Sequence, residues 1–136
     1  MLTIMLSGIR LPSFVKDYFR AIEPTTSAKT RISYAYDLRV FFNFLIENNP
    51  VFEAYETNHF SYKDLENIEP VDIEEYLDYL KYQKNYSDYT IENYENDILE
   101  FLSYLTRESI DFLDGCYDDL RFYLMYLKEE KEDNNS

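Results

Sequence analysis

One stretch decides the fold: Ser27-Ala-Lys-Thr30-Arg-Ile-Ser-Tyr34-Ala-Tyr-Asp37-Leu38-Arg-Val-Phe41-Phe42-Asn-Phe44-Leu45. Its pattern returns 60 residues later as Ser87-x-x-Thr90-x-x-x-Tyr94-x-x-Asp97-Ile98-x-x-Phe101-Leu102-x-Tyr104-Leu105. An internal repeat indicates the structural unit from which a chain is built. Apolar residues recur at helical spacing in both copies. Each copy therefore predicts a long amphipathic helix that begins with hydroxyl side chains.

A shorter pattern follows each copy, and its two occurrences lie 47 residues apart. It consists of Asp72-Ile73, Tyr76-Leu77 and Tyr79-Leu80, and then of Asp119-Leu120, Tyr123-Leu124 and Tyr126-Leu127. The repeating unit predicted from these spacings is a long helix, a loop and a shorter helix.

The composition favours a single helical domain. The chain has 136 residues, of which 46% are apolar, with only two Gly and four Pro for turns. No apolar run approaches the roughly 20 residues that span a bilayer, and the opening seven residues lack a secretory signal. The single cysteine, Cys116, excludes an internal disulfide. We expect a soluble, cytoplasmic protein that contacts no membrane.

Helical periodicity predicts five helices, and no segment alternates with the period of a strand. The helices are expected at about residues 11–22, 28–48, 70–83, 89–107 and 118–130. Pro12 and Pro70 suit a first helical turn, and Pro50 stops the second helix. The predicted class is all-α, a compact bundle of four to five helices over residues 11–130. Residues 1–10 form a leader, and 131–136 a frayed polar tail.

Charge is distributed unevenly along the chain. The total is −14, but residues 1–46 hold six basic groups and three acidic ones. That segment is therefore +3 and the remainder −17, an asymmetry that can mark an interaction face. Acidic helix surfaces are also common in soluble proteins without any such role.

The N-terminal pattern resembles a known family. The Ser27-x-x-Thr30-x-x-x-Tyr34-x-x-Asp37-Leu38 segment looks like the second helix of the N-terminal core-binding domain of tyrosine recombinases, the phage-integrase and Xer group. Leu11-Pro12-Ser13-Phe14-Val15 is similar to that family's first helix, and Asp72-Ile73-Glu74-Glu75-Tyr76-Leu77 to its third. The resemblance is best over residues 11–83 and implies a SAM-like helical fold.

Residues 85–130 admit two alignments with the same family. They can supply the fourth helix of one bundle, or form a partial second copy of the second and third helices. The repeat of Ser87, Thr90, Tyr94 and Asp97 favours the second copy. In both cases the helices need one another to bury their apolar faces.

The resemblance implies binding to double-stranded DNA beside a recombination site, through cations that face phosphates. The family's second helix places the contact at Ser27, Lys29, Thr30, Arg31 and Arg39, where a helix N-terminus adds N–H donors. Ordinary solvent-facing cations are the alternative. Residues 88–106 contain five carboxylates and no cation, so binding by this chain alone is expected to be weak. The resemblance also implies contacts with other recombinase protomers.

Catalytic and metal chemistry are not predicted. The family's His-x-x-Arg motif is absent, because the only histidine, His59, is followed by Phe60-Ser61-Tyr62. The tyrosines fit core and boundary positions, since a nucleophile would need cations to stabilise the transition state. Asp111, Asp114, Asp118 and Asp119 do not keep the register of a calcium loop, and His59 with Cys116 makes no zinc site. We expect no catalytic residue, metal or cofactor.

Two functions remain open from the sequence. The first is a non-catalytic DNA-binding module of a tyrosine recombinase, which clamps recombination-site DNA during integration or site-specific recombination. The second is an acidic helical protein-interaction module, either a recombinase-assembly partner or a DNA mimic. Placement of the six N-terminal cations should discriminate them, because a DNA-binding surface needs several cations on one face.

Overall fold

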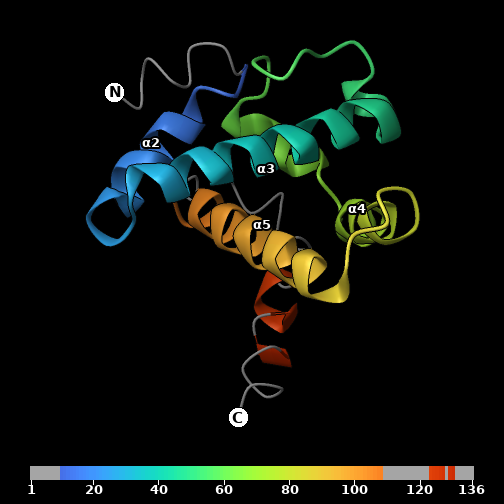
Figure 1. Ribbon diagram of the computed structural model, residues 1–136. Coiled ribbons are helices and arrows are strands. Elements are labelled where there is room, and N and C mark those ends of the chain that lie inside the picture. Colours follow the sequence, from blue (N-terminus) through green and yellow to red (C-terminus); the bar gives the residue numbers. More distant parts are fainter. Residues whose placement is uncertain (1–9, 109–122, 128, 131–136) are drawn as a thin grey trace. The chain divides into compact units, whose positions relative to one another are not determined.

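The protein is all-α in the computed structural model, which describes residues 10–108, 123–127 and 129–130 (Figure 1). These residues form helices and connections without a strand, as the periodicity predicted. None of the helices in the described ranges is long and apolar enough to cross a membrane. The chain divides into two compact units, Met1–Ser61 and Tyr62–Ser136, each described here by itself. The predicted single bundle over 11–130 stays a prediction.

The first unit is built on two α-helices joined by a short turn. Its elements are α2 (Phe14–Ile22), the 3₁₀ turn η1 (Glu23–Thr25), α3 (Ala28–Asn48) and the 3₁₀ turn η2 (Pro50–Phe52). The bounds of α3 are those predicted, since Ser27 caps its start and extended Asn49 precedes Pro50 at its end. Helix α2 begins three residues later than predicted, so Pro12 lies before the helix rather than in its first turn.

Aromatic rings fill the core of the first unit. The ring of Phe42 on α3 lies 6.2 Å from that of Phe14 on α2 and 4.8 Å from that of Phe60. Phe60 in turn lies 4.8 Å from Phe52 of η2, and all four side chains are buried. Such ring pairs add to the free energy of area burial. They hold residues 50–60 against α3.

The second unit contains the 3₁₀ segment η3 (Tyr62–Asn67), α4 (Pro70–Tyr82) and α5 (Asp88–Glu108). Residues 123–127 and 129–130 are also helical, within the fifth predicted helix. Its predicted start and the 131–136 tail lie outside the described residues. Pro70 occupies the first turn of α4, and the Asp72 carboxylate accepts a hydrogen bond of 2.8 Å from the Glu69 N–H.

The 60-residue repeat is present in the structure. Helices α3 and α5 both have 21 residues, and their bounds differ by that spacing. Phe41 and Phe101 are both fully buried, at 0% exposure, and Tyr34 and Tyr94 are both half-buried. The preceding helices, α2 and α4, also end 60 residues apart, at Ile22 and Tyr82. Each copy is therefore a helix pair: a shorter helix, a five-residue connector and a 21-residue helix.

The shorter pattern is repeated less closely. Tyr76 is fully buried, whereas its counterpart Tyr123 is half-buried. Leu77 is half-buried, whereas its counterpart Leu124 is 2% exposed. The two segments share a sequence pattern, but the tyrosine of the Tyr-Leu pair is buried in the first segment and the leucine is buried in the second.

Candidate nucleic-acid interface

The predicted contact segment begins at the N-terminus of α3. Ser27 caps the helix, since its Oγ accepts a hydrogen bond of 3.1 Å from the Thr30 N–H. The Ser27 and Thr30 hydroxyls lie 2.9 Å apart, so they also bond to each other. The side chains of Ser27 and Lys29 are exposed, and that of Thr30 is half-buried. The helix start is thus capped and accessible, with a cation beside it.

Arg39 lies further along the same helix and is also exposed. Its guanidinium lies over the ring of Tyr36, 5.5 Å from the centroid, which restrains the side chain on the helix surface. At 100° per residue, Lys29, Tyr36 and Arg39 fall within one broad side of α3. The two cations are separated by about 15 Å along the axis, at 1.5 Å per residue. They can therefore reach two different phosphates of one duplex.

Arg31 is placed differently from the other four predicted contact residues. It is only 7% exposed, and its Nη1 lies 2.6 Å from the Thr26 carbonyl oxygen, 3.0 Å from the Thr26 hydroxyl and 3.3 Å from the Glu23 carbonyl oxygen. A phosphate contact needs an accessible guanidinium. The geometry therefore favours a role for Arg31 within the α2–α3 connector.

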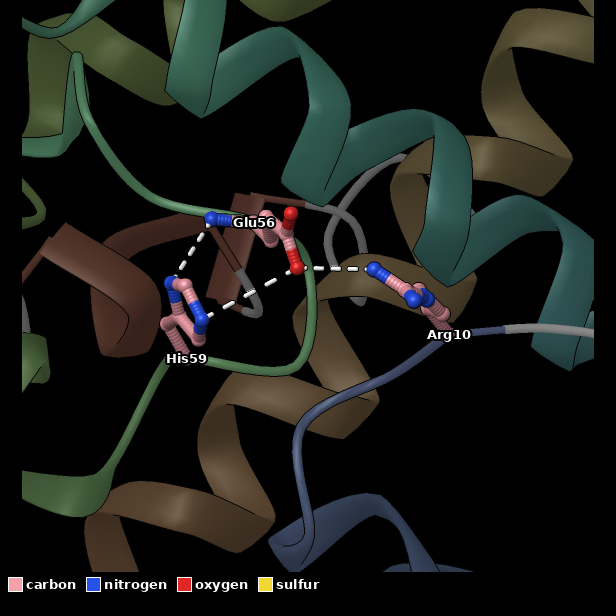
Figure 2. A network of polar contacts seen from close by, with 3 residues as sticks. All are labelled: Arg10, Glu56 and His59. Carbon is pink, nitrogen blue, oxygen red and sulfur yellow. Dashed lines mark hydrogen bonds and ion pairs between the residues drawn. The ribbon is translucent and has the colours of Figure 1, made fainter.

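The remaining cations of the first unit divide into paired and unpaired ones. Figure 2 shows Arg10, whose Nη1 lies 2.7 Å from the Glu56 carboxylate. The same carboxylate lies 3.9 Å from Nε2 of His59, whose Nδ1 accepts a hydrogen bond from the Glu56 N–H. Arg20 lies 3.7 Å from Asp17. Lys16, Lys29 and Arg39 are exposed and form no ion pair within the described residues. Three of the six cations thus remain available for a ligand.

The start of α5 reproduces the cap of α3 with a different surface. The Ser87 Oγ accepts a hydrogen bond of 3.2 Å from the Thr90 N–H, and the two hydroxyls again lie 2.9 Å apart. Within α5 the exposed charges next to this cap are acidic, namely Asp88 and Glu92, with Glu100 further along. The two helices share backbone geometry and differ in the sign of their exposed charge.

Two tyrosines of the second unit donate hydrogen bonds to carboxylates. Partial burial, and then the nearby Glu74 carboxylate that accepts its hydrogen bond of 3.4 Å, raise the pKa of Tyr123 to about 12. The Tyr126 hydroxyl donates a hydrogen bond of 2.6 Å to Glu130, which also raises the pKa of Tyr126. Both phenols stay protonated at neutral pH.

Metal ligands do not gather in the part of the chain that the structure describes, where no three His, Cys, Asp or Glu side chains form a group. Cys116 and the aspartates 111, 114, 118 and 119 lie outside the described residues. His59 is engaged with Glu56 through both ring nitrogens.

The described residues therefore form a helical protein built from two helix pairs, with exposed cations on the outer side of α3. Comparison with family models then identifies the relationship, because residues 73–136 match the phage integrase, N-terminal SAM-like domain. This part of the chain is similar to that family, and the match supports a DNA-binding role related to recombination. Comparisons with curated proteins and with solved structures gave no significant match.

The family match lies in the second copy of the repeat. It begins within α4, includes all of α5, and overlaps the 11–83 segment only at 73–83. The division into 11–83 and 85–130 therefore stays a prediction. The match covers slightly less than half of the chain. The matching model describes an N-terminal domain of phage integrases.

Sequence reasoning did not predict the burial of Arg31, although a signal was present. Arg31 shares the apolar stripe of α3, at helical spacing from the buried Ala35, Leu38 and Phe42. Its counterpart in the second copy is apolar, Ile91. When a cation lies on a buried apolar stripe and the equivalent position of the repeat is apolar, the cation is expected to make an internal contact rather than a ligand contact.

Proposed function

We propose that this protein is a non-catalytic DNA-binding module of the tyrosine-recombinase type, which clamps recombination-site DNA during integration or site-specific recombination. The observation that carries the proposal is the match of residues 73–136 to the integrase N-terminal SAM-like domain. The exposed cationic side of α3 supports it, because phosphate binding needs accessible cations.

The contact is assigned to the start and the outer side of α3. Lys29 and Arg39 face phosphates, and the exposed cap at Ser27 and Thr30 brings the positive end of the helix dipole close to the backbone. Two cations release few counterions, and the net charge of −14 opposes approach to DNA. Affinity is therefore weak without further recombinase protomers, which supply the remaining contacts.

A second function is favoured by the surface of α5. Asp88, Glu92 and Glu100 are exposed on this helix, and it carries no cation before Arg107. Such a surface repels phosphate and attracts a basic protein face. The alternative is thus an acidic helical interaction module, either a recombinase-assembly partner or a DNA mimic.

A titration of labelled duplex at low salt separates the two functions. The double variant Lys29→Ala/Arg39→Ala should lose most of the affinity for duplex. In the parent, the logarithm of the binding constant should fall against the logarithm of the salt concentration with a slope of about −2, and in the variant this slope should approach zero. The matched control is Lys63→Ala/Lys81→Ala, which removes the same charge from exposed lysines of the second unit and should retain binding. Failure of the parent to bind duplex at low salt would refute DNA binding and leave the interaction module.

A further inference from the structure

We infer that Arg31 is a positioning residue, which joins the end of α2 to the first turn of α3 and thereby fixes the helix start that meets DNA. Its part in DNA binding rests on the function proposed above. The structural part, a cationic latch inside the α2–α3 connector, stands on the contacts of the described residues alone.

The latch is a continuous chain of hydrogen bonds across the connector. The last residue of α2, Ile22, accepts a hydrogen bond of 2.7 Å on its carbonyl oxygen from the Thr26 hydroxyl. That hydroxyl accepts from Nη1 of Arg31, at 3.0 Å, and the same nitrogen donates to the Thr26 carbonyl oxygen at 2.6 Å. Arg31 belongs to α3, so the network links both helices through one guanidinium.

The helix start depends on the same residues. Extended Thr26 directly precedes the cap residue Ser27, whose Oγ holds the Thr30 N–H. The Arg31 backbone N–H donates a hydrogen bond of 3.1 Å to the Ser27 carbonyl oxygen. Fixing Thr26 therefore fixes the residue that caps the helix, and with it the position of the exposed Lys29.

The second helix pair closes its connector with main-chain hydrogen bonds. Ile91 stands in place of Arg31. Tyr79 O accepts from the N–H groups of Gln83 and Lys84 at 3.0 and 3.1 Å, and Leu80 O from the Tyr86 N–H at 3.1 Å. Asn85 adopts a positive φ of 56°, which turns the backbone so that these bonds form. In the first pair Pro24 lacks an N–H, and the Arg31 side chain donates to two connector carbonyl oxygens, those of Glu23 and Thr26.

Burial makes the latch costly to remove. Arg31 is 7% exposed and has no carboxylate within 4.0 Å among the described residues. Its charge is compensated by two carbonyl oxygens and a hydroxyl. Replacement by an apolar side chain removes the donor at 2.6 Å from the part-buried Thr26 carbonyl oxygen, whereas the Glu23 carbonyl oxygen still accepts from the Thr26 N–H at 3.4 Å.

The test separates an internal latch from a phosphate contact by two measurements on the full chain. Amide hydrogen exchange at Thr30 reports the helix start, and the salt slope of duplex binding reports phosphate contacts. Arg31→Met should accelerate exchange at Thr30 by about tenfold and leave the slope unchanged, because a hydrogen-bonded charge is lost from the connector and no phosphate contact is lost. Lys29→Met, the control, should leave exchange unchanged and reduce the slope by about 0.9.

Thr26→Val removes only the hydroxyl relay and keeps the shape of the side chain. Like Arg31→Met, it should accelerate amide hydrogen exchange at Thr30. The test therefore remains decisive if Arg31→Met fails to fold. Unchanged exchange in Thr26→Val would overturn the latch, and so would a lower salt slope in Arg31→Met with unchanged exchange. Absence of duplex binding by the parent would refute the proposed function, while the exchange measurement would still decide the latch.

Discussion

Truncation of the two equivalent core phenylalanines tests the repeat and the domain organisation together. Phe41 and Phe101 occupy the same position of α3 and α5, and both are at 0% exposure. Replacing a fully buried Phe by Ala costs about 3–5 kcal/mol, from lost transfer free energy and the remaining cavity. The Phe41 ring also packs edge-on against Phe42 at 5.6 Å, which places Phe41→Ala near the upper end of that range.

The expected effect is large compared with the whole stability of a domain, about 5–15 kcal/mol. For a chain of this length it corresponds to a fall in Tm of about 10–20 °C. Urea unfolding followed by circular dichroism, with calorimetry, measures both quantities. Tyr89→Ala is the control, since Tyr89 lies on α5 at 76% exposure and should change the free energy of unfolding by less than about 0.5 kcal/mol.

The same experiment examines the single bundle predicted over residues 11–130. If the helices bury one another in one cooperative core, both variants shift one common transition by similar amounts. Two separate transitions, one sensitive to Phe41→Ala and the other to Phe101→Ala, would refute the single bundle and support independent units at 1–61 and 62–136. A loss below about 1 kcal/mol for either variant would refute the core assignment itself.

Three further predictions follow from the contacts. Ser27→Ala and Ser87→Ala remove equivalent caps, so each should cost about 1 kcal/mol in urea unfolding, and a large difference between them would contradict the structural repeat. Glu92→Gln/Glu95→Gln/Glu100→Gln should strengthen duplex binding at low salt, because carboxylates beside phosphate are repulsive; unchanged affinity would place α5 away from DNA. The pKa of Tyr123, raised from 10.0 to about 12 in the folded protein, favours the folded state below pH 10 and loses that contribution as pH rises from about 10 to 12. Glu74→Gln should lower the pKa of Tyr123 in an ultraviolet titration, and no change would contradict the Glu74 contact.

The sequence predicted those parts of the fold in which several local signals agree. Helix α3 has a hydroxyl cap at Ser27, a continuous apolar stripe and a stop at Pro50, and its bounds were predicted correctly. The start of α2 was placed too early, because Pro12 fits a first turn equally well in or before a helix. The helix-pair repeat was missed because α2 and α4 end 60 residues apart but differ in length, with 9 and 13 residues, and share no residue pattern at that spacing.

The candidate site was less predictable than the fold. A sequence shows that Lys29, Arg31 and Arg39 lie on one helix, but their accessibility depends on tertiary packing. The position of Arg31 on the apolar stripe indicates burial, but its hydrogen bonds to the Glu23 and Thr26 carbonyl oxygens depend on how the connector before α3 folds. Pairing of Arg10 with Glu56, 46 residues away, is likewise a tertiary event.

The two helix pairs show that core pattern and surface charge vary independently in this chain. Capping hydroxyls and a buried phenylalanine recur at the same positions of α3 and α5, whereas exposed cations predominate on the N-terminal half of α3 and exposed carboxylates on that of α5. The family match covers residues 73–136, which include α5 with its exposed carboxylates. The two proposed functions therefore need not compete for one surface. DNA contact fits the outer side of α3, and a basic protein partner fits that of α5, so neutralising Lys29 and Arg39 should weaken DNA binding without weakening such a partner's binding.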